Sequence, residues 1–185
     1  MMTPFSNYLF ITKRLLLILS VISLYLPVSF AQDAPLSEPE SLMDKMTGEW
    51  VMTGSIEKQQ VTHDVNVDWI LNRQYIRIHE ISREKNDDGD FAYEAWIHIV
   101  WDQENKEYAV MWLDNTARTN FAAEGVGHAK PDGDRIPFEW RSEDGSGIRN
   151  TFSYDRTTDR WSWRIENIDK SGQLSSFANL ILKRK

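Results

Sequence analysis

Met46-Thr47-Gly48-Glu49-Trp50 is the stretch at which the chain is expected to change from helix to strand. Upstream of it, Ser37-Glu38-Pro39-Glu40 has the form of a capping box with proline in the first turn, so we expect a short helix from there to about Met46. Gly48 can end that helix, because glycine readily adopts the left-handed conformation found after helix C-termini. From Trp50 onward, extended segments alternate with turn clusters to the end of the chain. The stretch therefore predicts the start of an all-β domain.

Ten strands are predicted from this point on, separated by clusters of the glycine, proline, aspartate and asparagine residues that tight turns require. The predicted strands are Glu49–Ile56, Val61–Leu71, Gln74–Arg83, Phe91–Trp101, Glu107–Leu113, Thr119–His128, Arg135–Arg141, Ile148–Tyr154, Arg160–Ile168 and Leu174–Arg184. No helix-length run with a period of 3.6 residues interrupts them, which argues against an α/β fold. We predict an all-β fold, an antiparallel up-and-down barrel of about ten strands with a short N-terminal helix.

Alternation along the strands predicts which face is buried. The predicted inward faces carry Val61, His63, Val65, Val67 and Trp69 on the second strand, and Trp161, Trp163 and Ile165 on the ninth. The fourth strand departs from this rule, because Trp96 and Val100 lie opposite its main apolar face. That strand is either covered on both sides or part of a surface that binds a partner.

Gly48 and Trp50 at the head of the first strand resemble the Gly-x-Trp signature that opens the lipocalin-like, or calycin, β-barrels. The resemblance implies that Trp50 plugs one end of the barrel, with a basic side chain from the last strand over its ring. If the first and last strands pair antiparallel, Arg184 is the candidate, since it shares a strand face with Leu180 and Leu182. A guanidinium over an indole contributes about 0.5–2 kcal/mol to closure of the barrel.

A second resemblance covers the central hairpin, in which Trp101-Asp102 precedes a polar turn and Tyr108–Asp114 follows it. This hairpin is similar to that of an uncharacterised family of secreted bacterial lipocalin-like proteins. The resemblance implies a barrel that can enclose a cavity. It supplies no catalytic residues, and we predict neither a cofactor nor a bound metal.

The first 31 residues have the pattern of a signal peptide. Lys13-Arg14 precede an apolar run from Leu15 to Val28, and Ser29-Phe30-Ala31 places small residues where a signal peptidase cleaves. The run is shorter than the ~20 residues of a membrane-spanning helix, so we expect cleavage after Ala31 rather than a retained anchor. Removing 31 of the 185 residues leaves 154, enough for a single barrel domain over residues 32–185.

Composition restricts the compartment and the partners. The chain has no cysteine, so disulfides are excluded and a periplasmic or secreted bacterial location is predicted. Without Lys13 and Arg14 the 21 basic residues fall to 19 against 28 acidic ones, a net charge of −9. That charge repels phosphate backbones and anionic lipids, which predicts no nucleic-acid binding and no stable membrane insertion after cleavage. The composition is compatible with a homo-oligomer as well as with a monomer.

The histidines suggest one site. His63, His79 and His98 fall on three successive predicted strands, and a tight turn at Leu71-Asn72-Arg73 would bring His63 and His79 close together diagonally. A zinc-type site would need all three around one ion. The alternative is a polar core histidine at His63 with the other two exposed.

Carboxylates give a second hypothesis, an enzyme. Glu94 and Glu124 are predicted on inward faces of neighbouring strands, where burial would raise the pKa of a carboxyl for acid–base chemistry. No Gly-x-Ser-x-Gly, His-Glu-x-x-His, P-loop or dinucleotide motif occurs. An enzyme is therefore the least favoured of three classes, behind a binding protein and an interaction or envelope protein without a ligand.

Aromatic residues on predicted inward faces carry the functional prediction. We expect the barrel to bind a small apolar or aromatic molecule. The predicted ligand-binding residues are the aromatic wall Trp140, Phe152, Trp161 and Trp163, with Asn150, Arg77 and His63 as polar groups among them. The alternative is that these rings pack against one another and fill the barrel.

Overall fold

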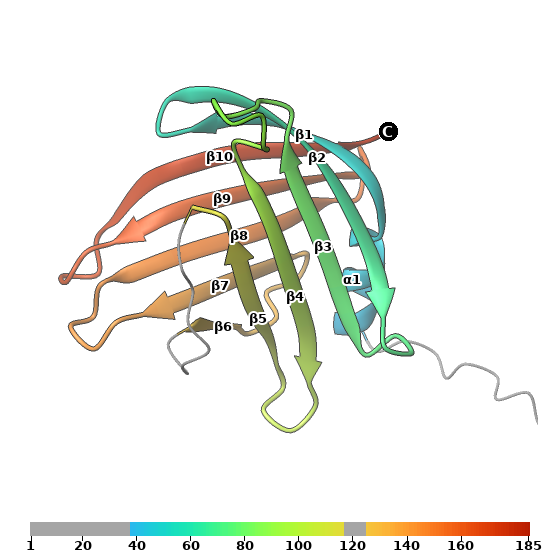
Figure 1. Cartoon of the computed structure of the whole chain (residues 1–185). Helices are drawn as coiled ribbons and strands as arrows, with labels where there is room; N and C mark the ends of the chain where they lie inside the picture. Colours follow the sequence, from blue (N-terminus) through green and yellow to red (C-terminus); the bar gives the residue numbers. More distant parts are fainter. Residues whose placement is uncertain (1–37, 117–124) are drawn as a thin grey trace, which may run out of the picture. The chain divides into compact units, whose positions relative to one another are not determined.

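The structure, a computed structural model, describes residues 38–116 and 125–185. The strands form one closed antiparallel barrel, in which each strand pairs with its neighbours in sequence and β1 also pairs with β10 (Figure 1). The elements are α1 (Glu38–Met46), β1 (Gly48–Ile56), β2 (Gln59–Ile70), β3 (Tyr75–Ser82), β4 (Glu94–Asp102), β5 (Glu107–Asp114), β6 (Val126–Ala129), β7 (Arg135–Arg141), β8 (Gly147–Asp155), β9 (Arg160–Ile168) and β10 (Leu174–Arg184). The predicted all-β barrel of ten strands with a short N-terminal helix is confirmed.

Two strands begin later than predicted. β4 begins at Glu94 rather than at Phe91, because Phe91 pairs with Lys85 in an isolated bridge outside the strand. β6 covers only Val126–Ala129, and residues 119–124 of the predicted strand lie outside the described residues. The other predicted strands agree with the observed ones to within two residues.

The predicted signal peptide, its cleavage after Ala31 and the cap at Ser37 also lie outside the described residues. They stay predictions. In the part of the chain that the structure describes, no helix is long and apolar enough to cross a membrane.

Large side chains fill the inner face of the barrel. The largest fully buried ones are Trp50, Trp161, Trp163, Tyr108, Phe138 and Phe152. Alternation produces this arrangement, as β3 shows, where Ile76 and Ile78 are buried and the residues between them face outward. Burying each such side chain contributes about 1.5–3 kcal/mol, so the interior supplies most of the driving force for folding.

The seam between β6 and β7 is the weakest part of the barrel. His128 and Glu139 form the one register pair between these strands within residues 125–185. Pro137 lies two residues before Glu139 and has no N–H to donate to β6, which limits the ladder. The indole of Trp140 covers the gap, and a Cβ on Gly127 would lie 2.5 Å from its Cε2. Only glycine fits beneath that ring.

Barrel closure brings Arg184 beside Trp50. The two residues are directly paired between β1 and β10, and the guanidinium lies 4.1 Å from the centre of the indole ring. Arg184 also donates to the carbonyls of Thr47 (2.8 Å) and Lys45 (3.2 Å) and, at 2.6 Å, to the carboxylate of Asp159. One side chain therefore ties the last strand to the first strand, to the end of α1 and to the β8–β9 turn.

Replacing Arg184 with methionine should lower the free energy of unfolding by about 2 kcal/mol, because the change removes the cation over Trp50 and several charged hydrogen bonds. Urea unfolding followed by tryptophan fluorescence measures this change. Lys183→Met is the matched control, since Lys183 is exposed on the opposite face of β10 and should contribute less than about 0.5 kcal/mol. Equal losses for the two variants would show that closure does not depend on Arg184.

Candidate functional site

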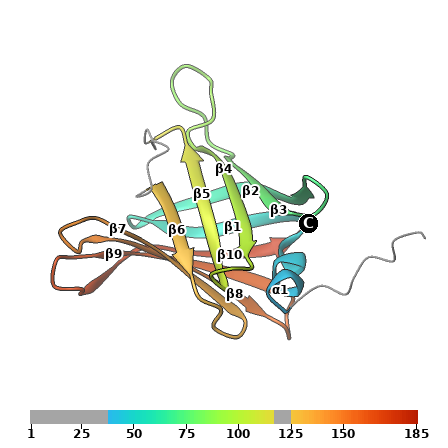
Figure 2. The same cartoon turned by 90° about the horizontal axis from the view of Figure 1, so that it is seen from below.

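α1 closes one end of the barrel (Figures 1 and 2). Three aromatic side chains on the inner face donate hydrogen bonds to its main-chain carbonyls. The Nε1 of Trp50 donates to Met46 (2.7 Å), the Nε1 of Trp161 donates to Lys45 (3.2 Å), and the hydroxyl of Tyr108 donates to Pro39 (3.1 Å). Polar atoms at this end therefore find partners, and the end is sealed.

A buried polar pair lies toward the opposite end of the barrel. His63 of β2 and Glu80 of β3 meet at 2.6 Å between Nδ1 and Oε1, and each side chain is only 3% exposed. The ring of Tyr93 stacks on His63 with centroids 5.5 Å apart. The Tyr93 hydroxyl in turn accepts a hydrogen bond from Trp112 Nε1 (3.0 Å). We call His63, Glu80 and Tyr93 the polar layer.

Burial sets the protonation of this layer. Desolvation raises the pKa of Glu80, the hydrogen bond and charge of His63 oppose that rise, and the nearby charge of Asp114 adds to it. Burial, together with the charges of Glu80 and Asp114, raises the pKa of Tyr93 above its ordinary range, so its hydroxyl stays neutral. The layer holds polar groups that resist additional negative charge.

An aromatic cluster lies beside the polar layer. The rings of Phe152 and Trp163 meet edge to face at 4.6 Å, and Phe138 packs on Phe152 at 5.7 Å. Trp112 reaches Trp163 with ring centroids 6.2 Å apart. Because β5 and β9 are on opposite sides of the closed sheet, this last contact spans the barrel. We call Trp112, Phe138, Phe152 and Trp163 the aromatic cluster.

Two buried polar atoms in this region are unsatisfied. Asn150 Oδ1 and Trp163 Nε1 have no hydrogen-bond partner among the residues that the structure describes. Asn150 is 2% exposed and Trp163 is 1% exposed. Asn150 pairs with Ile165, and Phe152 pairs with Trp163, so the two polar residues are diagonal neighbours on β8 and β9. Buried polar groups are nearly always paired in folded proteins, so these two atoms stand out among the buried polar groups of the described residues.

The predicted wall is partly assembled. Phe152, Trp163 and Asn150 lie together on β8 and β9. Trp140 joins them through Phe138, because the ring centroids of Trp140 and Phe138 are 6.2 Å apart. Trp161 lies apart, at the end sealed by α1. His63 faces the interior from β2, in the polar layer.

The prediction that Arg77 faces the interior is wrong, because Arg77 lies on the outer face of the barrel. Its guanidinium pairs with Asp68 at 2.7 Å and lies 5.6 Å from the centre of the Trp96 ring. The loop between β2 and β3 explains the error. Ile70 pairs with Tyr75, so four residues form the loop where three were expected, and even-numbered residues of β3 point inward.

The same change of parity corrects two other predictions. His79 faces outward, stacks on Trp96 at 3.8 Å and cannot approach His63. Glu94 also faces outward, hydrogen-bonded to His79 Nε2 at 2.8 Å and 38% exposed, so it is not an inward carboxylate. Glu124, the other carboxylate predicted to face inward, lies outside the described residues. Residues 38–116 and 125–185 contain no group of three His, Cys, Asp or Glu side chains placed to hold a metal ion.

Glu80, Tyr93 and Trp112 are the residues that the sequence analysis missed. The signal for Glu80 was present, since Ile76, Ile78 and Glu80 alternate along β3 once the loop length is known. Trp112 follows from alternation with Val110 on β5. Tyr93 precedes β4, and its position depends on the bend of the chain before that strand.

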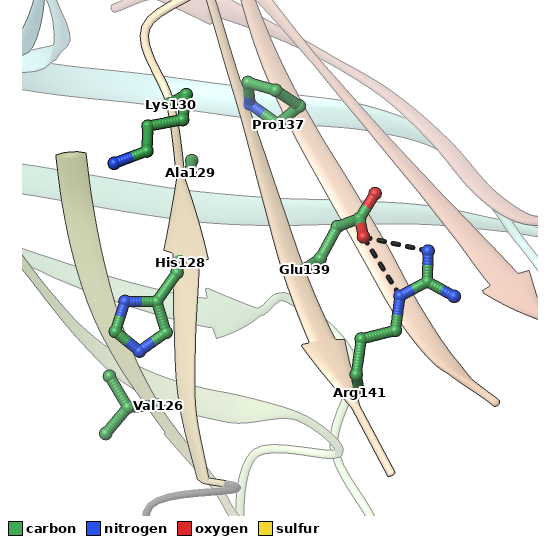
Figure 3. Close-up of a pocket in the computed structure, with 7 residues that line it drawn as sticks. All are labelled: Val126, His128, Ala129, Lys130, Pro137, Glu139 and Arg141. Atoms are coloured by element: carbon green, nitrogen blue, oxygen red, sulfur yellow. Dashed lines mark hydrogen bonds and ion pairs between the residues drawn. The ribbon is translucent and has the colours of Figure 1, made fainter. Parts of the chain in front are cut away.

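A groove of about 650 Å³ lies on the outer surface over the β6–β7 seam (Figure 3). It is lined by Val126, His128, Ala129, Lys130, Pro137, Glu139 and Arg141. His128 and Lys130 pair with Glu107 at 3.0 and 2.9 Å, and Arg141 pairs with Glu139 at 2.9 Å. Its charges thus offset one another, and the groove does not present a single sign of charge to a ligand.

No protein-family model matches the chain, and no curated protein matches it. Among solved structures, the crystal structure of Rv2717c from M. tuberculosis is similar, with a TM-score of 0.51 and 12% sequence identity. The match covers 81% of this chain and 99% of that one. At this identity the likeness supports the barrel fold alone.

The Glu80→Gln substitution should change the pH dependence of stability. Because the pKa of Glu80 is raised in the folded state, its contribution is complete below its unfolded pKa of about 4.5 and declines as pH rises through the folded pKa. The melting temperature of the wild type, relative to Glu80→Gln, should therefore fall as the pH rises above about 4.5. Thermal unfolding at several pH values measures the difference.

Glu94→Gln is the matched control, since Glu94 also bonds a histidine but is half-exposed. Its difference from the wild type should vary little over the same range, because exposed pairs contribute at most about 1 kcal/mol. A wild-type advantage over Glu80→Gln that grows with pH would contradict the assignment.

Proposed function

We propose that the barrel binds a small, largely apolar or aromatic molecule between the aromatic cluster and the polar layer. The observation that carries this proposal is the pair of unsatisfied buried atoms, Asn150 Oδ1 and Trp163 Nε1. Leaving such an atom without a partner costs about 1–3 kcal/mol, and the Trp161 indole at the α1 end shows that the fold can satisfy one. A bound molecule would supply the partners.

The chemistry of the surroundings favours a neutral, flat ligand. Phe152 and Trp163 already meet in the edge-to-face arrangement that aromatic rings prefer, and a further ring can join such a group. Glu80 and Asp114 disfavour an anion in the same region, as the raised pKa of Tyr93 indicates. These features support a carrier or binding protein and require no chemical step.

The proposed setting is the bacterial periplasm or the secreted fraction, in keeping with the lipocalin-like resemblance. The basic pair and apolar run before Ala31 and the lack of cysteine support export. The net charge of −9 after cleavage supports a small-molecule partner over nucleic acid. An enzyme has less support, because Glu94 and His98, the residues whose burial would have favoured one, face outward.

Tryptophan quenching and thermal shift with a panel of lipids, tetrapyrroles and aromatic compounds test the proposal. Trp163→Phe should weaken the binding of an aromatic compound about fivefold to tenfold, because the indole lies at the proposed site. Trp161→Phe is the matched control and should leave affinity within about twofold, since that ring contacts α1. The binding hypothesis is refuted if no compound quenches the tryptophan fluorescence saturably. The proposed position of the ligand is wrong if Trp161→Phe weakens binding as much as Trp163→Phe does.

A second candidate function, association through the outer face of β3–β5, is favoured by Trp96. This side chain is 37% exposed, with His79 and Leu113 as its cross-strand neighbours. Val100 is half-buried on the same face, between Tyr75 and Ala109. Exposed apolar surface of this kind is typical of contact sites, and we propose a second copy of the chain as the partner.

Sedimentation velocity across a concentration series tests this association. Trp96→Glu should convert a dimer to monomer, because it buries a charge at the contact. Ile181→Glu is the control, since Ile181 is 46% exposed but paired with Thr53 and Ser162 on a polar face. A wild-type protein that stays monomeric at every concentration would exclude the dimer.

A further inference from the structure

We infer that the ligand carries a neutral hydroxyl group on its aromatic body, as a phenol does. This inference rests on the proposed function and narrows it to a chemical class. Asn150 Oδ1 can only accept a hydrogen bond, and Trp163 Nε1 can only donate one. A hydroxyl both donates and accepts, so a single group can satisfy both atoms.

The strand register allows one group to reach both atoms. Asn150 pairs with Ile165 and Trp163 pairs with Phe152, which places the two side chains diagonally on the same inner face. Diagonal neighbours are about 7–8 Å apart at the backbone, with their side chains closer. An oxygen that accepts from one atom and donates to the other would lie about 2.9 Å from each. The ring that carries the oxygen would then lie against Phe152 and Trp163, which are 4.6 Å apart.

Other polar groups fit less well. A carboxylate offers no proton to Asn150 Oδ1, and burying its charge without a paired cation is costly. An ammonium group accepts no hydrogen bond from Trp163 Nε1. A ketone satisfies the indole but not the amide oxygen, and a hydrocarbon satisfies neither. Among the groups compared, the hydroxyl is the one that satisfies both atoms.

Three probes of one size separate these classes: p-cresol, p-xylene and p-toluate, which place a hydroxyl, a methyl and a carboxylate on the same ring. Titration calorimetry gives their affinities, and the indole N–H resonance of Trp163, assigned by its loss in Trp163→Phe, reports the hydrogen bond. We expect p-cresol to bind at least about tenfold more tightly than p-xylene, and p-toluate to bind most weakly. The Trp163 resonance should move with p-cresol alone.

Asn150→Leu should reduce the preference for p-cresol over p-xylene to within about threefold, while p-xylene still binds. Trp161→Phe, at the sealed end, should keep the full preference, and a folded Trp163→Phe tests the same point if Asn150→Leu does not fold. Equal affinities for p-cresol and p-xylene, with an unmoved Trp163 resonance, would refute the inference that the ligand carries a hydroxyl group. The proposed function would still hold in that case. A buried water only, bridging Asn150 and Trp163 in a crystal soaked with p-cresol, would overturn the hydroxyl inference too. No binding by any compound of this panel or the broader one would remove the proposed function itself.

Discussion

Closure of the sheet by the β1–β10 pairing is the constraint on which the rest of the structure depends. A ten-strand meander has two free edges until Trp50 meets Arg184, and the register of that pair then fixes the shear of the whole barrel. Arg184 also reaches the carbonyls at the end of α1, so closure and the sealing of one barrel end depend on the same side chain. The barrel thereby gains two unlike ends.

The unlike ends explain where the polar groups lie. At the α1 end, the carbonyls of Lys45 and Met46, left free at the C-terminus of the helix, accept from inward-facing indoles. The Tyr108 hydroxyl donates to Pro39 in the first turn of the same helix. Farther from α1, His63 and Glu80 pair with each other, whereas Asn150 Oδ1 has no partner among the described residues. The His63–Glu80 pair carries a desolvation cost that a pair of well-packed apolar residues would avoid.

Sequence patterns predicted the parts of the structure that depend on local alternation. The strands, the position of Trp50 and the inward face of β9 follow from period-2 alternation and turn residues. The errors on β3 have one cause, the four-residue loop after Ile70, because a single extra residue reverses every side chain that follows. Because odd-numbered residues of β3 were assigned to the interior, Arg77 was wrongly included among the predicted ligand-binding residues and Glu80 was left out. The unsatisfied atoms were beyond sequence reasoning, since satisfaction depends on contacts between several strands.

Aromatic content alone could not separate a filled barrel from a binding barrel, because rings pack well in either case. Phe152 and Trp163 touch, and Trp112 meets Trp163 across the interior, which by itself describes a filled core. The proposal of a binding barrel therefore rests on the unpaired polar atoms, because a buried polar group without a partner carries a desolvation cost that packing alone does not offset. A molecule that pairs with Asn150 and Trp163 would bind the folded state alone and stabilise it by mass action. Under the proposed function, these two side chains would link their desolvation cost in the ligand-free protein to affinity for a ligand.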